Sequence, residues 1–263
     1  MKLTRFKYII LLLPLFSGAL HSFGQRRGFD NLTWFDDRKL HFGFYLGLTT
    51  MDYRLTNYNN VYDNPVFADA ALRAKAQAIY GAQTNFAANI SKILPGFTVG
   101  GVVNARLGRD LDLRFTPGMS LGDRLFHFYN PSVLDPTITG ENPATYLRIK
   151  STYIDLPMGI RYKALRHRNV RPYIYAGGAY RIDLAATNKQ DGVVHVKKYG
   201  KYAETALGLD SYLEYFRFTV EFRFSYGLDN LIKHDVSTDH IPYYGYVFKE
   251  VNSNLFTLIF YFE

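Results

Sequence analysis

The stretch FRFTVEFRFSY, residues 216–226, alternates apolar and polar side chains with the period of two that is typical of a β-strand. One side of this strand carries phenylalanine, while the other carries Arg217, Glu221 and Arg223. In a soluble sandwich the apolar side faces a protein core, whereas in an outer-membrane barrel it faces lipid and the charged side faces the lumen. The rest of the sequence decides between these two orientations.

The composition favours strands and excludes several kinds of site. Aromatic residues make up 17% of the 263 residues, with 22 Tyr and 21 Phe against one Trp, and such residues are enriched in strands and in the aromatic girdles of membrane barrels. The chain has no Cys, which excludes disulfides, thiolate metal sites, cysteine nucleophiles and a lipid-modified N-terminal cysteine.

The N-terminus has the pattern of a secretory signal peptide. A basic start at Lys2, Arg5 and Lys7 precedes a short apolar run at 9–16, which is too short to span a membrane as a helix. We expect a signal peptide at 1–24, cleaved after Gly24 in preference to Ala19, a periplasmic lead-in segment at 25–38 and a barrel at 39–263. Without the three signal-peptide cations, 28 basic residues face 23 acidic ones, with no basic run that would indicate nucleic-acid binding.

Eight segments of the mature chain alternate in this way, and most have about the 9–11 residues that a tilted strand needs to cross a bilayer. They are 39–50, 96–107, 111–121, 151–163, 170–184, 202–213, 216–228 and 254–262. An even number suits a bacterial outer-membrane barrel. The sequence therefore predicts an all-β fold, an eight-stranded antiparallel up-and-down transmembrane barrel.

The connections between these segments alternate strictly in length. Long ones follow the odd-numbered strands, at 51–95, 122–150, 185–201 and 229–253. Short ones follow the even-numbered strands, at 108–110, 164–169 and 214–215. Outer-membrane barrels have short periplasmic turns and long outer loops, so we expect a multi-pass protein of the cell outer membrane with both termini in the periplasm. This sorting also resolves the orientation of 216–226, whose phenylalanine side we place in lipid.

The same alternation predicts which side chains face lipid and which face the lumen. The lipid-facing set includes Phe42, Phe44, Phe218, Phe222, Phe224, Phe256, Phe260 and Phe262. The inward set holds six cations and six anions: Arg106, Arg114, Arg161, Arg181, Arg217, Arg223, Asp112, Asp155, Asp183, Glu204, Asp210 and Glu221. Buried charges are tolerated when paired, and eight strands enclose a lumen that side chains can fill. We expect an ion-pair network that plugs the barrel; a proton or ion pathway is the alternative.

Two local features interrupt the regular pattern. Pro117 and Pro157 fall within predicted strands, where proline removes a ladder hydrogen bond, so a bulge or a frayed ladder is expected near one of them. The Ala-rich run 68–83 in the first long connection has helical propensity and is either a short helix over the barrel mouth or an ordered loop.

Residues that could carry chemistry are few. The stretch HDVSTDH, residues 234–240, matches no known spacing of metal ligands. A pair of groups for hydrolysis could come from His127, His195, Ser237 or Asp239, but the sequence shows no arrangement of nucleophile and base at the strand ends. No cofactor, metal, nucleic acid or small-molecule substrate is indicated. The cations near His195, at Lys197, Lys198 and Lys201, either contact lipopolysaccharide phosphates or form a solvated loop face.

Several stretches resemble a known family. They are NLTWFDDRKLHFGFYLGL (31–48), STYIDLPMGIRYK (151–163), RPYIYAGGAYRIDL (171–184) and the closing LFTLIFYFE (255–263). The first resembles the PorT family of outer-membrane barrel proteins from bacteria of the Bacteroidota type, and the others resemble barrels of that phylum in general. The resemblance implies a part in the type IX protein secretion system and, in some members, in gliding motility, with no catalytic residues. PorT-like barrels usually end on an aromatic residue, whereas here Glu263 follows Phe262.

Three functions are compatible with this sequence. The first is a non-enzymatic component or assembly factor of the type IX machinery, with membrane lipid, lipopolysaccharide and other secretion proteins as partners. The second is a generic structural or adhesive barrel. The third is an enzyme acting at the barrel mouth, which would depend on His127, His195 or His240.

Overall fold

The structure is a computed structural model that describes residues 30–80, 87–129, 146–185, 196–232 and 246–263. Side chains are described in the same ranges except at 79–80, 87–93, 125–129 and 146–149. The predicted signal peptide lies outside these ranges and stays a prediction.

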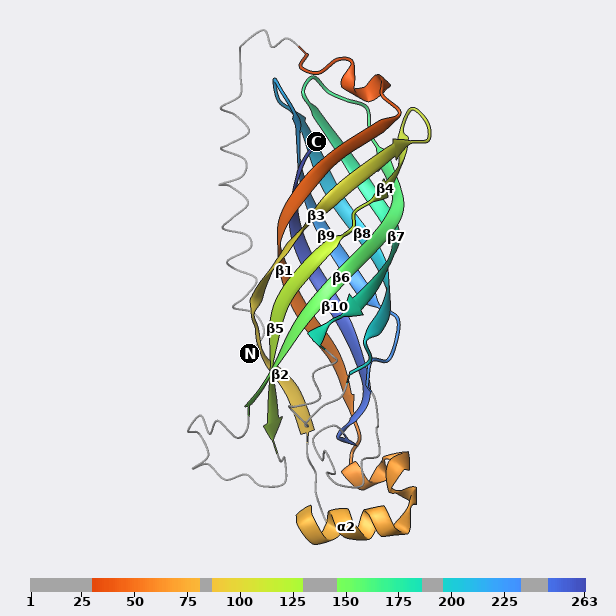
Figure 1. The fold of residues 1–263 in the computed structure, drawn as a ribbon, viewed down its shortest axis with the longest axis vertical. Helices are drawn as coiled ribbons and strands as arrows, with labels where there is room; N and C mark the ends of the chain where they lie inside the picture. Colours follow the sequence, from red (N-terminus) through yellow and green to blue (C-terminus); the bar gives the residue numbers. More distant parts are fainter. Residues whose placement is uncertain (1–29, 81–86, 130–145, 186–195, 233–245) are drawn as a thin grey trace, which may run out of the picture.

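One antiparallel sheet forms the body of the molecule and closes on itself (Figure 1). Its ten strands in the described ranges are β1 Leu40–Asn57, β2 Ala87–Ile93, β3 Pro95–Arg106, β4 Leu111–Phe115, β5 Gly118–Tyr129, β6 Tyr146–Lys163, β7 Val170–Asp183, β8 Tyr199–Tyr212, β9 Arg217–Gly227 and β10 Phe248–Phe262. Neighbours in the chain pair from β6 to β10, and β1 pairs with β10 on one side and with β3 on the other. The pairing of β1 with β3 closes the barrel.

The ten strands make eight passes along the barrel. Only Leu94 separates β2 from β3, and only Thr116 and Pro117 separate β4 from β5. Both β4 and β5 pair with β3 on one side and with β6 on the other. The structure therefore confirms the predicted eight-stranded antiparallel up-and-down barrel.

Several strands are longer than the sequence pattern indicated, always at the end that carries the long connections. β1 continues to Asn57 instead of ending at 50, β6 begins at Tyr146 instead of 151, and β10 begins at Phe248 instead of 254. The pattern failed here because the outward side chains turn polar beyond 50, for example at Asp52 and Arg54, while the ladder to β10 continues. The barrel thus extends beyond its apolar band.

The two ends of the barrel differ in their covering (Figure 1). At one end lie the short turns, the chain's C-terminus and the lead-in segment, which contains the 3-10 helix η1 (Phe35–Asp37). At the other end lie the long connections, with the 3-10 helices η2 (Val61–Asp63) and η3 (Pro65–Ala68) and the helix α2 (Ala70–Tyr80). Of the two alternatives for 68–83, a short helix or an ordered loop, the structure has the helix, α2. Among the described residues no helix is long and apolar enough to span a membrane.

The two strand prolines lie beside the break between β4 and β5. The pairing with β6 resumes in the same register after the break, because Phe115 faces Met158 and Gly118 faces Asp155. The ladder is therefore interrupted without a bulge. Pro157 provides no N–H here, and the Tyr45 hydroxyl donates to the carbonyl of Thr116 instead (3.4 Å).

The outer face of the barrel carries the phenylalanines predicted to face lipid. Phe42 and Phe222 are 67% and 63% exposed, and Phe44 and Phe256 are also exposed. The other four are half-buried because their rings pack against neighbouring rings, as in the stacked pairs Phe44–Phe262 and Phe218–Phe260. The structure places all eight of these side chains on the outer face of the barrel, and their contact with lipid stays a prediction.

Glycines let tyrosine rings lie flat against the inner wall. A Cβ on Gly118 would lie 2.1 Å from the Tyr45 hydroxyl, and one on Gly208 would lie 2.2 Å from the Tyr173 ring. Gly159 and Gly177 make the same room for Tyr175. These close contacts fill the narrow lumen and pack rings over backbone that has no side chain of its own.

Candidate functional site: the filled lumen

An unbroken chain of alternating charges runs through the lumen. Its members are Lys163, Asp112, Arg161, Asp210, Arg217, Glu263, Arg114, Glu221, Arg223, Glu204, Arg181 and Asp155, each in contact with the next. We call this set the ion-pair chain. Six cations alternate with six anions, and every one of these side chains is nearly or fully buried. Within the ion-pair chain, each charge is therefore balanced by its neighbours.

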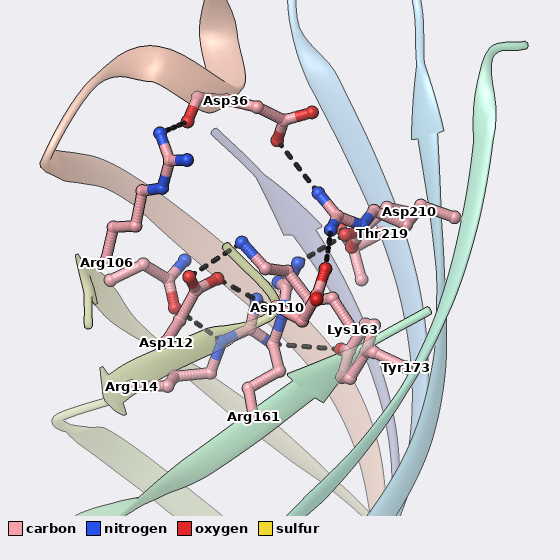
Figure 2. A network of polar contacts seen from close by, with 12 residues as sticks. Asp36, Arg106, Asp110, Asp112, Arg114, Arg161, Lys163, Tyr173, Asp210 and Thr219 are labelled. Atoms are coloured by element: carbon pink, nitrogen blue, oxygen red, sulfur yellow. Dashed lines mark hydrogen bonds and ion pairs between the residues drawn. The ribbon is translucent and has the colours of Figure 1, made fainter. Parts of the chain in front are cut away.

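The end of the ion-pair chain nearest the short turns is shown in Figure 2. The Asp112 carboxylate forms ion pairs with the Lys163 ammonium at 2.7 Å and the Arg161 guanidinium at 3.7 Å. Arg161 in turn donates to Asp210, which also accepts the Thr219 hydroxyl at 2.7 Å. These residues come from β4, β6, β8 and β9, and the contact of Arg161 with Asp210 joins β6 to β8, which are not neighbours in the sheet.

Glu221 of β9 is the best-connected carboxylate in the lumen. Arg114 lies 3.0 Å from it and Arg223 lies 2.7 Å from it. The hydroxyls of Tyr173 and Tyr261 donate to it at 2.5 Å and 3.0 Å. Four donors from four strands hold one buried anion, which satisfies its lone pairs and offsets the cost of removing it from water.

The far part of the ion-pair chain is centred on Arg181 of β7. Its guanidinium contacts Asp155 at 2.8 Å and Glu204 at 2.6 Å. Hydroxyls complete the shells of both carboxylates, since Ser120 donates to Asp155 and Ser225 donates to Glu204.

Aromatic rings cover the guanidinium groups of the lumen. Arg161 lies over Tyr173 at 4.2 Å, Arg181 over Tyr202 at 4.3 Å, Arg114 over Tyr261 at 4.5 Å and Arg223 over Tyr175 at 4.7 Å. Such cation–π contacts are strongest when desolvated, as here. They explain why the inward sides of the strands carry tyrosine as well as charge.

Ten of the twelve predicted lumen charges belong to the ion-pair chain, and two do not. Arg106 is 31% exposed at the end of β3 and contacts Asp37 of the lead-in segment at 4.0 Å. Asp183 is buried at the opposite end of the barrel, where it accepts the backbone N–H groups of Thr152 and Ala185. Both point inward, but each lies at the end of its strand, where the neighbours differ from those at mid-barrel.

Two members of the ion-pair chain were missed in the sequence. Lys163 follows Arg161 at a spacing of two, and Glu263 follows the outward Phe262, so alternation alone would have placed both in the lumen. The Glu263 side chain is fully buried, accepts from Asn104 at 2.5 Å and contacts Arg114 at 3.4 Å. The departure from an aromatic last residue thus supplies a lumen anion.

Arg124 of β5 was also missed in the sequence. Its partners are hydroxyl groups, whereas the arginines of the ion-pair chain have carboxylate partners. It is fully buried, and it donates to the hydroxyls of Tyr53, Ser151, Tyr153 and Ser253 at 2.5–3.3 Å. Tyr53 lies beyond the apolar band, and burial raises the pKa of its hydroxyl well above the ordinary value. That phenol therefore stays protonated and hydrogen-bonded.

The lead-in segment closes the short-turn end of the lumen. Phe35 is buried against His41, with ring centroids 4.2 Å apart, and covers the Arg217 guanidinium at 4.6 Å. Asp36 accepts the Tyr212 hydroxyl at 2.9 Å and lies 3.5 Å from Arg171. Residues 30–38 of this segment are therefore bound to the mouth of the barrel.

A hydrophobic cluster lies at the long-loop end. Its members are Tyr53, Val61, Tyr62, Phe67, Leu72, Ala76, Leu231, Ile232, Tyr246, Val247, Phe248 and Val251. They come from η2, η3, α2 and the ends of β1 and β10, together with 231–232 and 246–247. In the described part of the chain, side chains thus occupy the lumen from Phe35 to this cluster, which supports a plugged barrel.

The candidate catalytic and metal-binding residues are not brought together by the described structure. His195, His240, Ser237, Asp239 and the whole of 234–240 lie outside the described residues, as does the side chain of His127. Within the described ranges no cluster of three or more potential metal ligands exists. What the lumen can do chemically is hold charges in fixed pairs.

Comparison with known proteins agrees with this architecture. A family model described as an outer membrane protein beta-barrel domain matches residues 23–233. The chain belongs to this family. It is therefore an outer-membrane β-barrel protein, and the apolar band is the part that faces lipid.

Other comparisons are more distant. The crystal structure of the outer membrane protein OprG from Pseudomonas aeruginosa is similar over 84% of this chain and 92% of that chain, with 11% sequence identity and a TM-score of 0.39. No curated protein sequence matches this chain.

Proposed function

We propose that this protein is a non-enzymatic component or assembly factor of the type IX protein secretion machinery, and of gliding motility where that machinery supports it. The observation that carries the proposal is the stretch 31–48, whose FDDRKLHFGFYLG pattern resembles PorT. In the structure these residues form η1 and the first half of β1, and Phe35 and Asp36 close the lumen. The motif therefore has a definite structural role at the short-turn end of the barrel.

The filled lumen supports a function carried by surfaces. A barrel crossed by buried ion pairs and closed at both ends is suited to anchoring and docking, and it is poorly suited to passing a solute or a folded protein. Cargo would then cross the membrane through another part of the machinery.

The short turns and the lead-in segment would face the periplasm, and the long-loop end would face outward. Supporting this orientation, the lead-in segment and the C-terminus lie at the short-turn end, and short turns are periplasmic in bacterial barrels. That end exposes Leu165 and Tyr215, which are 72% and 84% exposed, and half of Trp34. These apolar side chains are the natural contacts for periplasmic or membrane-embedded parts of the machinery.

Deletion of the gene in its native host tests the proposal. Proteomics of the culture fluid should then show loss of the proteins that carry the type IX C-terminal sorting domain, with their accumulation in the periplasm and recovery on complementation. Normal secretion of those proteins would contradict the proposal.

Matched surface variants sharpen the test. Complementation with the Leu165→Ser, Tyr215→Ser double variant should give normal barrel yield but reduced secretion if the short-turn face is the docking surface. The Arg73→Ser, Lys75→Ser double variant changes exposed residues of α2 at the opposite end and should secrete normally.

A structural or adhesive barrel is the second candidate function. The observation that favours it is the folded cluster of η2, η3 and α2 at the long-loop end, which is more elaborate than a barrel closure requires. In that case the α2 double variant would lose surface attachment, while secretion would be normal even in the deletion strain.

A further inference from the structure

The outer wall of the barrel carries a groove within its apolar band. It has a volume of about 590 Å³ and lies across β8, β9, β10 and β1. Two rungs of the sheet form it, one with Thr205, Phe224, Phe256 and Thr50 and the next with Leu207, Phe222, Leu258 and Leu48. Threonines at both ends of the first rung leave room beside the tall phenylalanine and leucine side chains. The volume lies in the range of sites that hold small molecules.

A cationic rim lies above this groove, toward the long-loop end. Lys201 lies four residues before Thr205 on β8, and Arg54 lies four residues after Thr50 on β1. Each therefore lies about 13 Å along its strand from the groove. Both side chains are exposed. Lys197 and Lys249 are exposed on the same rim, where they adjoin Asn230.

Arg54 is held in place toward the groove. Its guanidinium lies over the ring of Tyr226 at 4.7 Å and donates to the hydroxyl of that tyrosine. Tyr226 of β9 is two residues from Phe224, which lies in the groove. The ring therefore places the positive charge of Arg54 between β1 and β9, directly above the apolar lining.

Acidic groups on the rim do not cancel this charge. Asp52 and Glu250 lie on β1 and β10, and Asp229 accepts the backbone N–H of Lys201 at 2.8 Å. Among the described residues, these three carboxylates face five cations: Arg54, Lys197, Lys198, Lys201 and Lys249. An anionic headgroup is thus favoured above an apolar groove.

We propose that this face binds the phosphorylated, acylated lipid A part of lipopolysaccharide, with acyl chains in the groove and a phosphate held by Arg54 and Lys201. Charge complementarity fixes the class as a phosphate-bearing acyl lipid. The choice of lipid A over a phospholipid rests on the orientation in the proposed function, because the long-loop end then lies in the outer leaflet, where lipopolysaccharide resides.

Native mass spectrometry of the purified mature protein, released from detergent micelles, tests this site. The probes are bis-phosphorylated hexa-acyl lipid A and phosphatidylglycerol, added separately and in competition. We expect wild-type protein to retain lipid A in preference to phosphatidylglycerol. The Arg54→Ser, Lys201→Ser double variant should bind lipid A about tenfold more weakly, as expected for the loss of a charge-assisted phosphate contact.

Two further variants separate the groove from the rim. Thr205→Phe fills the groove and should weaken lipid A binding with the rim intact, whereas Lys150→Ser removes an exposed lysine from β6, away from the groove, and should change nothing. The heat-dependent shift in gel mobility shows which variants are folded. Wild-type binding of lipid A by both the rim and groove variants would overturn the proposal.

The competition on wild-type protein needs no variant. Equal or stronger binding of phosphatidylglycerol would overturn the assignment to lipid A. If the deletion strain secretes normally but the purified protein still prefers lipid A, the type IX role is contradicted and the lipid A site is supported.

Discussion

Glu221 shows at the scale of one residue why charge is stable inside this barrel. A lone buried carboxylate costs several kcal/mol, yet this one is held by Arg114, Arg223, Tyr173 and Tyr261 at 2.5–3.0 Å. The two arginines are themselves covered by tyrosine rings and continue to Glu263 and Glu204. Removal of one member therefore leaves its neighbours as buried charges without a partner of opposite sign.

Glu221→Gln should lower the free energy of unfolding by about 3 kcal/mol, since it leaves buried cations without their shared anion. Urea unfolding of the protein in lipid vesicles, followed by circular dichroism, measures the change. The matched control is Glu214→Gln in an exposed short turn, which should change stability little. Equal effects at the two positions would contradict the role assigned to the ion-pair chain.

Phe222→Arg tests the lipid-facing side of β9. An arginine at mid-membrane depth on the outer face costs about 2–4 kcal/mol. Thr219→Ser on the lumen side keeps the hydroxyl that donates to Asp210 and should cost little. The same urea experiment compares the two, and equal tolerance would mean that the strand faces the other way.

At the scale of elements, the lead-in segment is the part whose contacts the sequence predicted least well. The sequence placed 25–38 in the periplasm as a lead-in but gave no sign that it closes the barrel, because its anchors are distant. Asp36 binds Tyr212, Arg166 and Arg171, which lie in β8, in the turn after β6 and in β7. Such contacts depend on barrel closure and leave no periodic trace in the sequence.

Asp36→Asn should loosen the lead-in segment without unfolding the barrel. Loss of its charged contacts should raise the rate of tryptic cleavage after Arg38 roughly tenfold, in line with the strength of hydrogen bonds to charged groups. Asp37→Asn is the matched control, because the neighbouring Asp37 side chain is 84% exposed. Cleavage at the same rate in both variants would show that Asp36 does not hold the segment.

The sequence predicted the elements wherever alternation and turn length carry the information. It identified eight passes, the sides of their phenylalanines and ten members of the ion-pair chain. It missed the extensions of β1, β6 and β10, because outward polar residues such as Asp52 break the apolar pattern while the backbone ladder continues. It also missed Arg124, whose partners are hydroxyls from β1, β6 and β10 that only closure brings together.

At the scale of the whole molecule, the protein is an outer-membrane β-barrel whose described interior is filled by side chains. Phe35 covers Arg217 at the short-turn end of the lumen, and the hydrophobic cluster around Phe248 lies at the long-loop end. Between them, arginine and tyrosine side chains pack against carboxylates and glycines. An eight-stranded barrel is narrow enough for such side chains to fill it, so the closure follows from strand number and composition together.

Planar-bilayer recording of the purified mature protein tests this filled lumen most directly. Current is measured across a bilayer into which folded protein has been inserted, with an open porin in the same bilayer system as the positive control. The ion-pair chain and its two closures predict no stable conductance steps above the bare bilayer. Reproducible, ion-selective open channels would contradict the account, because they require a continuous water path through residues that the structure packs together.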